Sequence, residues 1–501
     1  MKRIVNASPK LSWATRACAV MVLCATMGIA LPAQTLTTLF RFDIADGMYP
    51  EGTLVQATNG DFYGTTNLGP GQHGTVFKIR PGGTLTTLHR FCSQRNCTDG
   101  SNPAAGLVQA TNGNFYGTTY GGGDLTNCSG GCGAVFKMTP SGTLTTLYSF
   151  CSHSGCLDGE SPDAGLVQAT DGDFYGTTAY GGANIYGTIF KITPSGALTT
   201  LYSFCAQSGC PDGRSPSAGL VQATDGDFYG TTAYGGANSC TIVAPNQGCG
   251  TVFKITPSGT LTTLYSFCHQ TGCPDGSNPF AGLVQATGGD FYGTTVWGGA
   301  NACPPNGCGT IFKITTSGTF TTLHTFCLQT GCTDGSGSDA ALVQVTDGDL
   351  YGTSAGGGAN LSGGTIFKIA PSGALTTLYS FCAQSGCPDG EGPSGLVQAT
   401  NGDFYGTTLD RDGTVFSFSV GLGPFLETRP TSGKAGRFVE MLGTNLTGAT
   451  SVSFNGTAAA FTVVSQSLIS TTVPAGASTG EVQVVTPGGT LSSNVPFRVL
   501  P

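Results

Sequence analysis

Gly165-Leu-Val-Gln-Ala-Thr-Asp-Gly-Asp-Phe-Tyr-Gly-Thr-Thr178, Gly187-Thr-Ile-Phe-Lys-Ile-Thr-Pro-Ser-Gly196 and Leu198-Thr-Thr-Leu-Tyr-Ser-Phe204 are three parts of one unit. Versions of this unit recur from residue 36 to residue 419. Its Tyr-Gly-Thr-Thr signature, Thr-Ser in one copy, marks seven copies at Tyr63, Tyr116, Tyr175, Tyr229, Tyr292, Tyr351 and Tyr405. Self-similarity at a period of 53 to 63 residues predicts a repeat architecture.

Each unit divides into four strand-like runs, which we call a to d. Strand a is Gly-Leu-Val-Gln-Ala-Thr, strand b is Asp-Phe-Tyr-Gly-Thr-Thr, strand c is Gly-Thr-Val/Ile-Phe-Lys-Ile-Thr, and strand d is Leu-Thr-Thr-Leu-Tyr-Ser-Phe. Strands a and b are separated by Asn-Gly, Asp-Gly or Gly-Gly, dipeptides that favour a type I′ hairpin turn. A Pro-Ser-Gly turn joins c to d in most copies, with Pro fixing φ.

Four antiparallel strands repeated seven times predict an all-β, seven-bladed β-propeller over residues 34–420. The ends of the array support this prediction. Strand d first stands alone at residues 36–42, and the last unit, residues 395–419, has a, b and c without d. The N-terminal strand can therefore complete the last blade and close the ring, which removes exposed strand edges. An open solenoid is the alternative, but it needs capping repeats, which the sequence does not display.

Residues 424–501 have a different composition, without Cys and without the repeat. Short alternating runs such as Thr450–Phe454 and Glu481–Val485 indicate half-buried strands, and Asn455-Gly456 and Pro487–Gly489 mark turns between them. We expect a small immunoglobulin-like β-sandwich here.

Residues 1–33 have the pattern of a secretory leader. Lys2, Arg3, Lys10 and Arg16 precede or begin an apolar run, and Leu31–Ala33 ends at an expected cleavage before Gln34. A retained N-terminal anchor is the alternative, although the run is short for a membrane span. We therefore expect an exported protein, secreted, periplasmic or at the cell surface, with no transmembrane anchor after cleavage.

The charge of the chain disfavours nucleic-acid binding. The full chain has 20 Lys and Arg against 28 Asp and Glu, and loss of the four basic leader residues leaves 16, so the formal charge changes from −8 to −12. An acidic surface repels phosphate backbones. Gly accounts for 80 of the 501 residues without a collagen period, which agrees with many tight turns.

Two family resemblances follow from these motifs. The repeat resembles the GloVer tandem-repeat family, in which Gly-Leu-Val opens each unit, here at Gly106, Gly165, Gly219, Gly282 and Gly395. Two units depart from the motif, at Gly52 and Ala340. This resemblance implies an exported bacterial protein without an assigned activity. Residues 424–501 resemble an IPT/TIG domain, which implies an immunoglobulin-like spacer or interaction module.

The cysteines beyond the leader fall into local pairs. An even number in an exported chain predicts disulfides, each stabilising its loop by about 2 kcal/mol. Metal binding is the alternative, and we expect none because no partner His or Cys stands in register. The predicted pairs are Cys92/Cys97, Cys128/Cys132, Cys151/Cys156, Cys205/Cys210, Cys240/Cys249, Cys268/Cys273, Cys303/Cys308, Cys327/Cys332 and Cys382/Cys387.

A ligand site is expected on one face of the propeller. The d–a and b–c connections, which are long and carry every cysteine pair, must emerge on the face opposite the tight a–b and c–d turns, and variable loops on a rigid scaffold often bind ligands. The candidate ligand-binding residues on this face are Tyr120, Tyr180, Tyr234, Trp297, Asp410 and Asp412. The aromatic residues can stack on sugars or pack against protein, and the alternative is that they close blade-to-blade packing at one repeated position.

Other polar residues on this face have structural explanations. A d–a loop Asp before Gly occurs in every unit and predicts an Asx-type turn: Asp46, Asp99, Asp158, Asp212, Asp275, Asp334 and Asp389. His89 and His324 occupy the strand-d position of a Tyr and are expected to be structural. His73, His153 and His269 lie in loops without a common partner.

The sequence offers no catalytic residues and predicts no cofactor. It contains no nucleophile elbow and no phosphate loop between a strand and a helix. The favoured hypothesis is an exported, non-catalytic binding or scaffold protein whose partner is a glycan or a protein. The alternatives are a carbohydrate-active hydrolase or lyase that uses the same face, and a structural cell-surface component.

Overall fold

A computed structural model describes residues 34–500 except 153, 241–247, 300–302, 304–305, 329 and 360–362. The leader therefore lies outside the described residues, as does His153. Apart from two single-turn 3-10 helices, η1 (Pro70–Gln72) and η2 (Arg95–Cys97), the regular elements in these residues are β-strands. The prediction of an all-β chain is confirmed.

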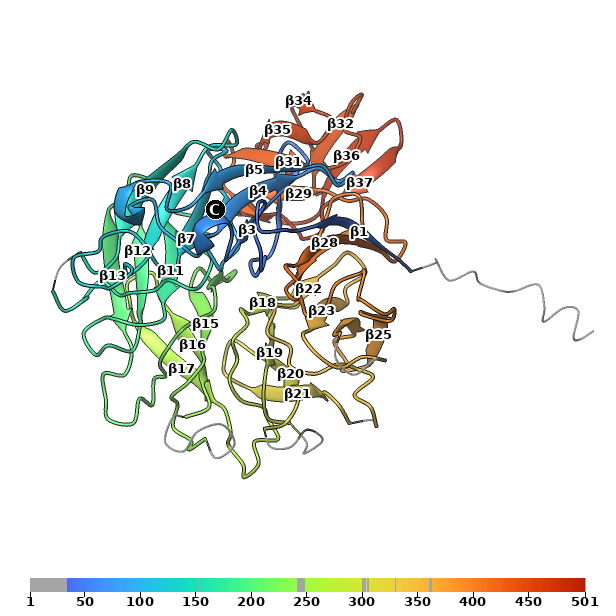
Figure 1. Cartoon of the computed structure of the whole chain (residues 1–501). Helices are drawn as coiled ribbons and strands as arrows, with labels where there is room; N and C mark the ends of the chain where they lie inside the picture. The colour runs from blue at the N-terminus through green and yellow to red at the C-terminus, as the bar shows by residue number, and fades with distance from the viewer. Residues whose placement is uncertain are drawn as a thin grey trace, which may run out of the picture.

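The repeat forms seven four-stranded antiparallel sheets, which we call blades 1 to 7 in chain order of their strand b. Figure 1 shows the blades arranged around a common centre. Strand a lies at one edge of each sheet, and b, c and d follow in order. In blade 7 the fourth strand is β1, which pairs antiparallel with β28 from Thr35 opposite Ser419 to Arg41 opposite Thr414.

The strands at each of the four positions have closely similar bounds. Strand a is β2 (Val55–Gln56), β6 (Val108–Gln109), β10 (Val167–Gln168), β14 (Val221–Gln222), β18 (Val284–Gln285), β22 (Val343–Gln344) and β26 (Pro393–Gln398). Strand b is β3 (Phe62–Thr66), β7 (Phe115–Thr119), β11 (Phe174–Thr178), β15 (Phe228–Thr232), β19 (Phe291–Thr295), β23 (Leu350–Ser354) and β27 (Phe404–Thr408).

The outer strands are equally regular. Strand c is β4 (Thr75–Ile79), β8 (Ala134–Met138), β12 (Thr188–Ile192), β16 (Thr251–Ile255), β20 (Thr310–Ile314), β24 (Thr365–Ile369) and β28 (Thr414–Ser419). Strand d is β5 (Leu85–Arg90), β9 (Leu144–Ser149), β13 (Leu198–Ser203), β17 (Leu261–Ser266), β21 (Phe320–Thr325), β25 (Leu375–Ser380) and β1 (Thr35–Arg41).

Aromatic rings join each blade to the next. Tyr175 of blade 3 stacks on Phe228 of blade 4, with ring centroids 4.0 Å apart and planes inclined by 26°. Tyr405 of blade 7 stacks on Phe62 of blade 1 with the same distance and angle. Six junctions have such a pair, and the junction of blades 5 and 6 has Leu350 in the place of the Phe.

A second aromatic contact recurs at all seven junctions. The Phe that ends strand d meets the strand-c Phe of the next blade edge to face, with centroids 5.1 to 5.4 Å apart. At the junction of the last and first blades this pair is Phe42 and Phe77. The core of the array is therefore a set of similar clusters between blades, and all of these phenylalanines are buried.

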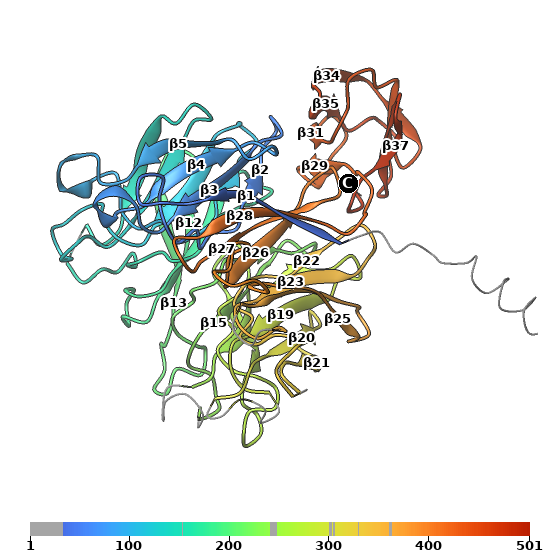
Figure 2. The ribbon, with the colours of Figure 1, turned by 45° about the vertical axis from the view of Figure 1, so that its right-hand side comes forward.

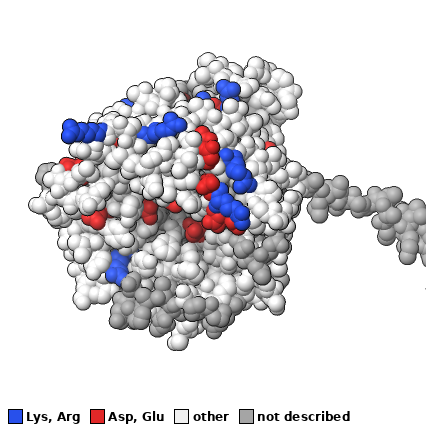
Figure 3. Space-filling view, viewed as in Figure 1, with Lys and Arg blue, Asp and Glu red and all other residues white. Residues whose placement is uncertain are grey.

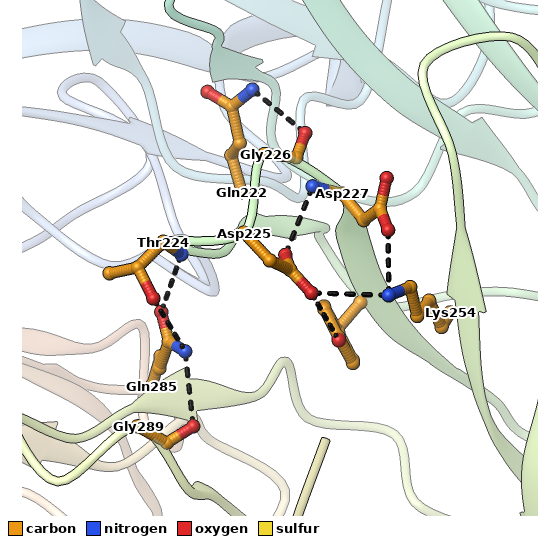
Figure 4. Close-up of polar contacts among 9 residues, drawn as sticks. Gln222, Thr224, Asp225, Gly226, Asp227, Lys254, Gln285 and Gly289 are labelled. Atoms are coloured by element: carbon orange, nitrogen blue, oxygen red, sulfur yellow. Dashed lines mark hydrogen bonds and ion pairs between the residues drawn. The ribbon is translucent and has the colours of Figure 1, made fainter. Parts of the chain in front are cut away.

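A glutamine from strand a supplies a polar link between blades, shown in Figure 4 for blades 4 and 5. The backbone N–H of Thr224 donates to Gln285 Oε1 at 2.9 Å, and Gln285 Nε2 donates to the Gly289 carbonyl at 3.0 Å. Six junctions have the Thr-to-Gln bond. Blades 6 and 7 lack it in the described residues, where Gln398 Nε2 is buried without a partner.

The a–b turns differ from the prediction of type I′. In Thr58–Gly60 only Gly60 has positive φ, 84°, and its N–H donates to Ala57 O at 2.8 Å. This is a three-residue loop that ends in a left-handed glycine, and not a two-residue turn with positive φ at both centres. The side chain of the preceding residue stabilises it, because Asn59 Oδ1 accepts from the Asp61 N–H at 3.0 Å.

Strand a is shorter than predicted because these strands converge at the centre of the array. Only two residues of it pair in blades 1 to 6. A Cβ at Gly165 would lie 3.2 Å from the Gly106 carbonyl oxygen, and one at Gly219 would lie 3.4 Å from that of Gly165. Close approach of neighbouring backbones thus explains the glycine that opens most units.

Two further four-stranded sheets follow the repeat. The first sheet has the strand order β29 (Glu427–Arg429), β31 (Phe438–Leu442), β35 (Leu468–Thr472) and β34 (Phe461–Ser465). The second has the order β33 (Thr457–Ala459), β32 (Ser451–Phe454), β36 (Val482–Thr486) and β37 (Gly489–Ser492). β30 (Ser432–Gly433) pairs parallel with β38 (Arg498–Val499). Both four-stranded sheets contribute to one buried cluster that includes Val439, Ile469, Phe454 and Val484. We call this unit the C-terminal sandwich, and Figure 2 shows it projecting from the array.

The array has two distinct faces. The d–a and b–c connections emerge on the loop face, and the a–b and c–d turns emerge on the turn face. The C-terminal sandwich contacts the turn face: Ser467 Oγ donates to the Thr58 carbonyl at 2.9 Å, and Arg429 Nη2 donates to the Gln56 carbonyl at 2.9 Å.

Nine disulfides brace the loop face in the described residues. Six close the C-x4-C rings of the d–a loops, and three lie in the b–c loops of blades 2, 4 and 5. Both cysteines of every C-x4-C ring have positive φ, as at Cys205 (62°) and Cys210 (50°). An acidic side chain stabilises this conformation, because the Cys205 N–H donates to Asp212 Oδ2 at 2.8 Å.

Cys273 shows that one of these disulfides also belongs to the core. Cys273 is bonded to Cys268, but its side chain is fully buried, 0% exposed, and belongs to the hydrophobic cluster between blades 4 and 5. Its Sγ atom lies 3.9 Å from Sγ of Cys249, which belongs to the disulfide of the b–c loop. The Cys240–Cys249 and Cys268–Cys273 disulfides therefore pack together within this cluster.

The stacked pairs predict equal stability losses at two junctions. Tyr175→Ala and Tyr405→Ala should each lower the free energy of unfolding by about 3 kcal/mol, because each removes a buried ring from the same kind of contact. Tyr292→Ala is the matched control: it faces Leu350 and should lose about 1 kcal/mol less. Chemical denaturation followed by circular dichroism measures all three. A Tyr405→Ala loss far below that of Tyr175→Ala would contradict equivalence of the two junctions.

The disulfides predict the thiol content. Purified residues 34–501 should show no free thiol in denaturant before reduction. The double substitution Cys205→Ser, Cys210→Ser should cost about 2 kcal/mol of unfolding free energy, because the ring that it opens is small. A thiol titration that finds several reactive cysteines without reduction would refute this pairing.

Candidate functional site

The centre of the loop face is marked by acidic side chains. Figure 3 views this face and shows Asp and Glu atoms gathered around its middle. In each unit, one residue just before strand a lies nearest the centre of the array. It stands three positions before the strand-a Leu, or two positions before it in blade 7. We call these seven residues the axial ring: Glu51, Ala104, Asp163, Ser217, Phe280, Asp339 and Ser394.

The axial ring differs between blades while its surroundings are repeated. A Pro precedes the ring residue in six of the seven units, as at Pro162 before Asp163 and Pro279 before Phe280. All seven residues are partly or fully exposed. Seven similar backbones therefore place three carboxylates, two hydroxyls, one methyl and one aromatic ring around one centre.

The pKa values of all three axial-ring carboxylates are raised. The surrounding protein raises the pKa of Glu51, and the charges of Asp163 and Asp339 raise it further, whereas a hydrogen bond from Asn67 Nδ2, 3.0 Å from Oε2, opposes the rise. Withdrawal from bulk water also raises the pKa of Asp163 and raises that of Asp339 to about 6. Glu51 and Asp339 still have solvent on one side, so the carboxylates remain accessible.

The predicted aromatic residues lie beside this ring. Tyr120 and Tyr180 are 42% and 46% exposed, which leaves ring surface free for a ligand. Burial raises the pKa of the Tyr120 hydroxyl, and nearby Tyr180 and Asp163 add to the rise, so these side chains form one cluster.

The interpretation of four aromatics at one repeated position is wrong for Tyr120. Three of the four form isolated backbone β-bridges with the preceding d–a loop: Tyr180 with Glu160, Tyr234 with Arg214 and Trp297 with Ser277. The bridging residue in blade 2 is Gly121, so Tyr120 stands one position earlier, where blade 3 has Ala179. Because side chains alternate along an extended chain, Tyr120 projects differently from the other three.

Tyr234 and Trp297 are only half-exposed. The Tyr234 ring lies 5.8 Å from the Arg214 guanidinium and edge-on to Phe280 of the axial ring, 6.1 Å between centroids. Tyr234 thus packs within the loop face while remaining next to the centre. Among the four predicted aromatic residues, Tyr120 and Tyr180 therefore have the most exposed side chains.

The two acidic residues of the last b–c loop, Asp410 and Asp412, have different surroundings. Burial raises the pKa of Asp410, with Glu391 adding to the rise and Arg411 opposing it. Asp412 is exposed, has positive φ (74°), and its carbonyl accepts from the Tyr49 N–H at 3.2 Å. Arg411 Nε donates to Glu391 Oε1 at 2.7 Å, so this loop supplies an ion pair next to Asp410.

The d–a loop Asp residues support the scaffold. Asp158 Oδ2 accepts from the Tyr148 hydroxyl at 2.9 Å and from the Cys151 N–H at 2.9 Å. His89 and His324 make the equivalent contact to Asp99 (3.1 Å) and Asp334 (2.9 Å). These bonds run back to strand d, and not forward as in the expected Asx turns. The two histidines therefore replace a Tyr structurally.

The cysteine pairs are closer to one another than the sequence suggested. The Sγ atoms of Cys128, Cys132, Cys151 and Cys156 all lie within 4.8 Å of one another, and so do those of Cys303, Cys308, Cys327 and Cys332. The expectation that no partner cysteine stands in register is thus wrong, because the cysteines of the b–c loop lie against the following C-x4-C ring, as Cys249 lies against Cys273. In the structure all of these cysteines are in disulfides, which leaves no thiolate for a metal.

The arrangement at the centre of the loop face can hold a polyhydroxylated ligand. Exposed tyrosine rings stack on the apolar faces of sugars, and carboxylates accept hydrogen bonds from hydroxyl groups. Sequence reasoning found the tyrosines but missed Glu51, Asp163 and Asp339. An alignment of the seven units on the strand-a Leu would have drawn attention to them, since the ring position has acidic, hydroxyl, methyl and aromatic side chains in different units.

Comparison with known proteins identifies the family of the repeat. Residues 26–244 and 240–463 both match the Gloeobacter/Verrucomicrobia repeat.

The chain belongs to the Gloeobacter/Verrucomicrobia repeat family.

The predicted resemblance of the repeat to this family is therefore confirmed. A search of curated proteins found no match. No helix in the described part of this family member is long and apolar enough to cross a membrane.

Solved structures resemble the Gloeobacter/Verrucomicrobia repeat chain in fold. The extracellular domain of a candidate hybrid two-component system protein from Bacteroides thetaiotaomicron is 12% identical, with a TM-score of 0.50, and the match covers 94% of this chain and 55% of that one. A candidate gluconolactonase (12% identity, TM-score 0.37, 78% and 94% coverage) and a luciferin-regenerating enzyme (10%, 0.39, 78% and 98%) match less closely. At these identities the similarity concerns the fold and carries no function.

The raised pKa of Asp339 predicts a pH-dependent effect of its removal. Ionisation of Asp339 opposes folding, since its pKa is about 6 in the folded protein against 3.8 for the ordinary side chain. Asp339→Asn should therefore raise the unfolding free energy at pH 8, and this gain should disappear as the pH falls through 6 to 4. Because solvent reaches the carboxylate, we expect about 1 kcal/mol or less. Urea unfolding at pH 4 and pH 8 measures the difference.

Ser217→Ala at the equivalent, non-titrating position is the matched control. Its effect should be the same at both pH values. An Asp339→Asn effect that does not change between pH 4 and pH 8 would show that Asp339 titrates as a free side chain.

Proposed function

We propose that this protein is an exported, non-catalytic binding protein that holds a carbohydrate at the centre of the loop face. The observation that carries the proposal is the axial ring: seven similar blades present differing side chains at one centre. A purely structural repeat has no need for such differences, whereas a single asymmetric ligand needs them. The exposed rings of Tyr120 and Tyr180 beside Asp163 suit a sugar.

The architecture that we propose for this function is a closed seven-bladed propeller at residues 34–420. Pairing of β1 with β28 and stacking of Tyr405 on Phe62 support closure. A closed ring gives the loop face a fixed geometry, which lowers the entropic cost of binding. Residues 1–33 act as the export signal, and the disulfides agree with an oxidising compartment.

We assign residues 424–501 to an IPT/TIG-like, immunoglobulin-like spacer or second contact site. The two sheets around the Val439 and Phe454 core support this assignment. The sandwich is seated on the turn face, so it leaves the loop face open to a ligand.

Binding of purified residues 34–501 to a broad glycan panel tests the proposal. Tyr120→Ala and Tyr180→Ala should each weaken binding of the recognised glycan by about tenfold, because a stacked ring contributes about 1 to 2 kcal/mol. Phe438→Ala is the matched control, since Phe438 is 51% exposed on the C-terminal sandwich. Trp297→Ala should have a smaller effect, because this side chain is half-buried. Binding that survives both tyrosine substitutions would refute the site.

A carbohydrate-active hydrolase or lyase is the second candidate function. Asp339 favours it, because a carboxyl group with a pKa of about 6 can act as a general acid near neutral pH. Turnover of the bound glycan that falls at least about a hundredfold in both Asp163→Asn and Asp339→Asn, with binding retained, would establish this function over simple binding. Assembly of the purified protein into sheets without any glycan binding would instead favour a structural cell-surface component.

A further inference from the structure

A cavity lies at the end of the array opposite the loop face, between the turn face and the C-terminal sandwich. It has a volume of about 760 Å³, within the range of small-molecule sites. The sandwich contacts blade 1 through Ser467 and Arg429, and the cavity extends from there along the ends of β6, β10 and β14. It therefore lies beneath blades 2 to 4.

The wall formed by the blades is repetitive and held in place. Val108, Val167 and Val221 contribute half-buried apolar surface. Beside them the side-chain amides of Gln168 and Gln222 are fixed, because their Oε1 atoms accept from backbone N–H groups of the preceding blade at 2.9 Å. Each Nε2 donates one hydrogen to its own turn, at 3.2 and 3.3 Å, which leaves a second hydrogen for a ligand.

The wall formed by the sandwich is cationic. Arg429, Lys434 and Arg437 line the cavity together with Glu427 and Glu440. Arg429 is already used, since its Nε donates to Glu427 Oε1 at 2.8 Å and its Nη1 to Gln109 Oε1 at 3.1 Å. Lys434 and Arg437 are exposed and have no carboxylate within ion-pair distance among the described residues.

The remaining carboxylate does not cancel these charges fully. Burial raises the pKa of Glu440, with Arg429 opposing the rise. The cavity thus has three cations against two acids, and two of the cationic heads are unpaired, in a chain with a formal charge of −8. Such a local reversal of charge attracts an anion.

We propose that this cavity binds an acidic oligosaccharide, carrying carboxylate or sulfate groups. The anionic groups lie against Lys434 and Arg437, the hydroxyls bond to the free amide hydrogens and to exposed Thr111 and Thr170, and the apolar sugar faces pack on the valines. This site is separate from the proposed site on the loop face, so either can exist without the other.

Isothermal titration of residues 34–501 with trigalacturonate and with a sulfated heparin disaccharide tests the proposal and distinguishes the two anionic groups. At least one of these should bind, with maltotriose as the neutral control and citrate as the small-anion control. Lys434→Ala with Arg437→Ala should weaken binding by about ten- to a hundredfold. Arg498→Ala, which removes an exposed cation outside the cavity, should change affinity less than about twofold.

A second variant blocks the cavity without changing its charge. Thr170→Trp fills the space in front of β10 from an exposed position and should abolish binding. Tyr120→Ala on the loop face should leave this binding unchanged, which separates the test from that of the loop-face site. Failure of both acidic saccharides to bind, equal binding of maltotriose or citrate, or full binding by the double variant would each overturn the proposal.

Discussion

Adjacent residues on strand b point to opposite sides of a blade, because side chains alternate along a β-strand. Phe62 therefore faces one neighbouring blade and Tyr63 the other, and the same pair of residues recurs in the second strand of nearly every unit. Each Tyr with a Phe partner meets it in a stacked pair, with centroids 4.0 to 4.7 Å apart. The adjacent Phe and Tyr of strand b thus supply both partners of the stacked contact, and this contact sets the spacing of the blades.

Much of the fold follows from features that recur. Seven copies of one pattern average out the ambiguity of any single run, so strand identity and blade count could be predicted from residues such as Tyr175 and its equivalents. The turn type could not, since Asp-Gly permits either a two-residue loop or a longer one, and only the paired Ala169 N–H and Asp173 carbonyl, 2.9 Å apart, select the latter.

The candidate site is harder to predict because it consists of exceptions to the repeat. Tyr120 could be proposed from its type, but its shift of one position relative to Tyr180 depends on the pairing of Gly121 with Ser101. Asp163 and Asp339 are 176 positions apart in the chain, and only the arrangement of the blades around a common centre brings their charges near Glu51. The cysteine clusters and the burial of Cys273 were missed for the same reason, since loops from different parts of a unit meet in space.

The two ends of the array differ in charge although one repeat builds both. On the loop face the axial ring contributes Glu51, Asp163 and Asp339. On the turn face the cationic groups Lys434 and Arg437 come from the sandwich and not from the blades. The repeat therefore provides a regular scaffold. Its chemical differences come from single replacements at one end and from the C-terminal sandwich at the other.

Blade 6 is bound less firmly than its neighbours on both sides. Leu350 replaces the aromatic partner of Tyr292 on one side, and the other side lacks the Thr-to-Gln bond in the described residues, with Gln398 Nε2 buried and unpaired. The junctions with the fewest contacts between blades are expected to separate first when the array unfolds. Unfolding of the array should therefore begin beside blade 6, where these two contacts between blades are missing among the described residues.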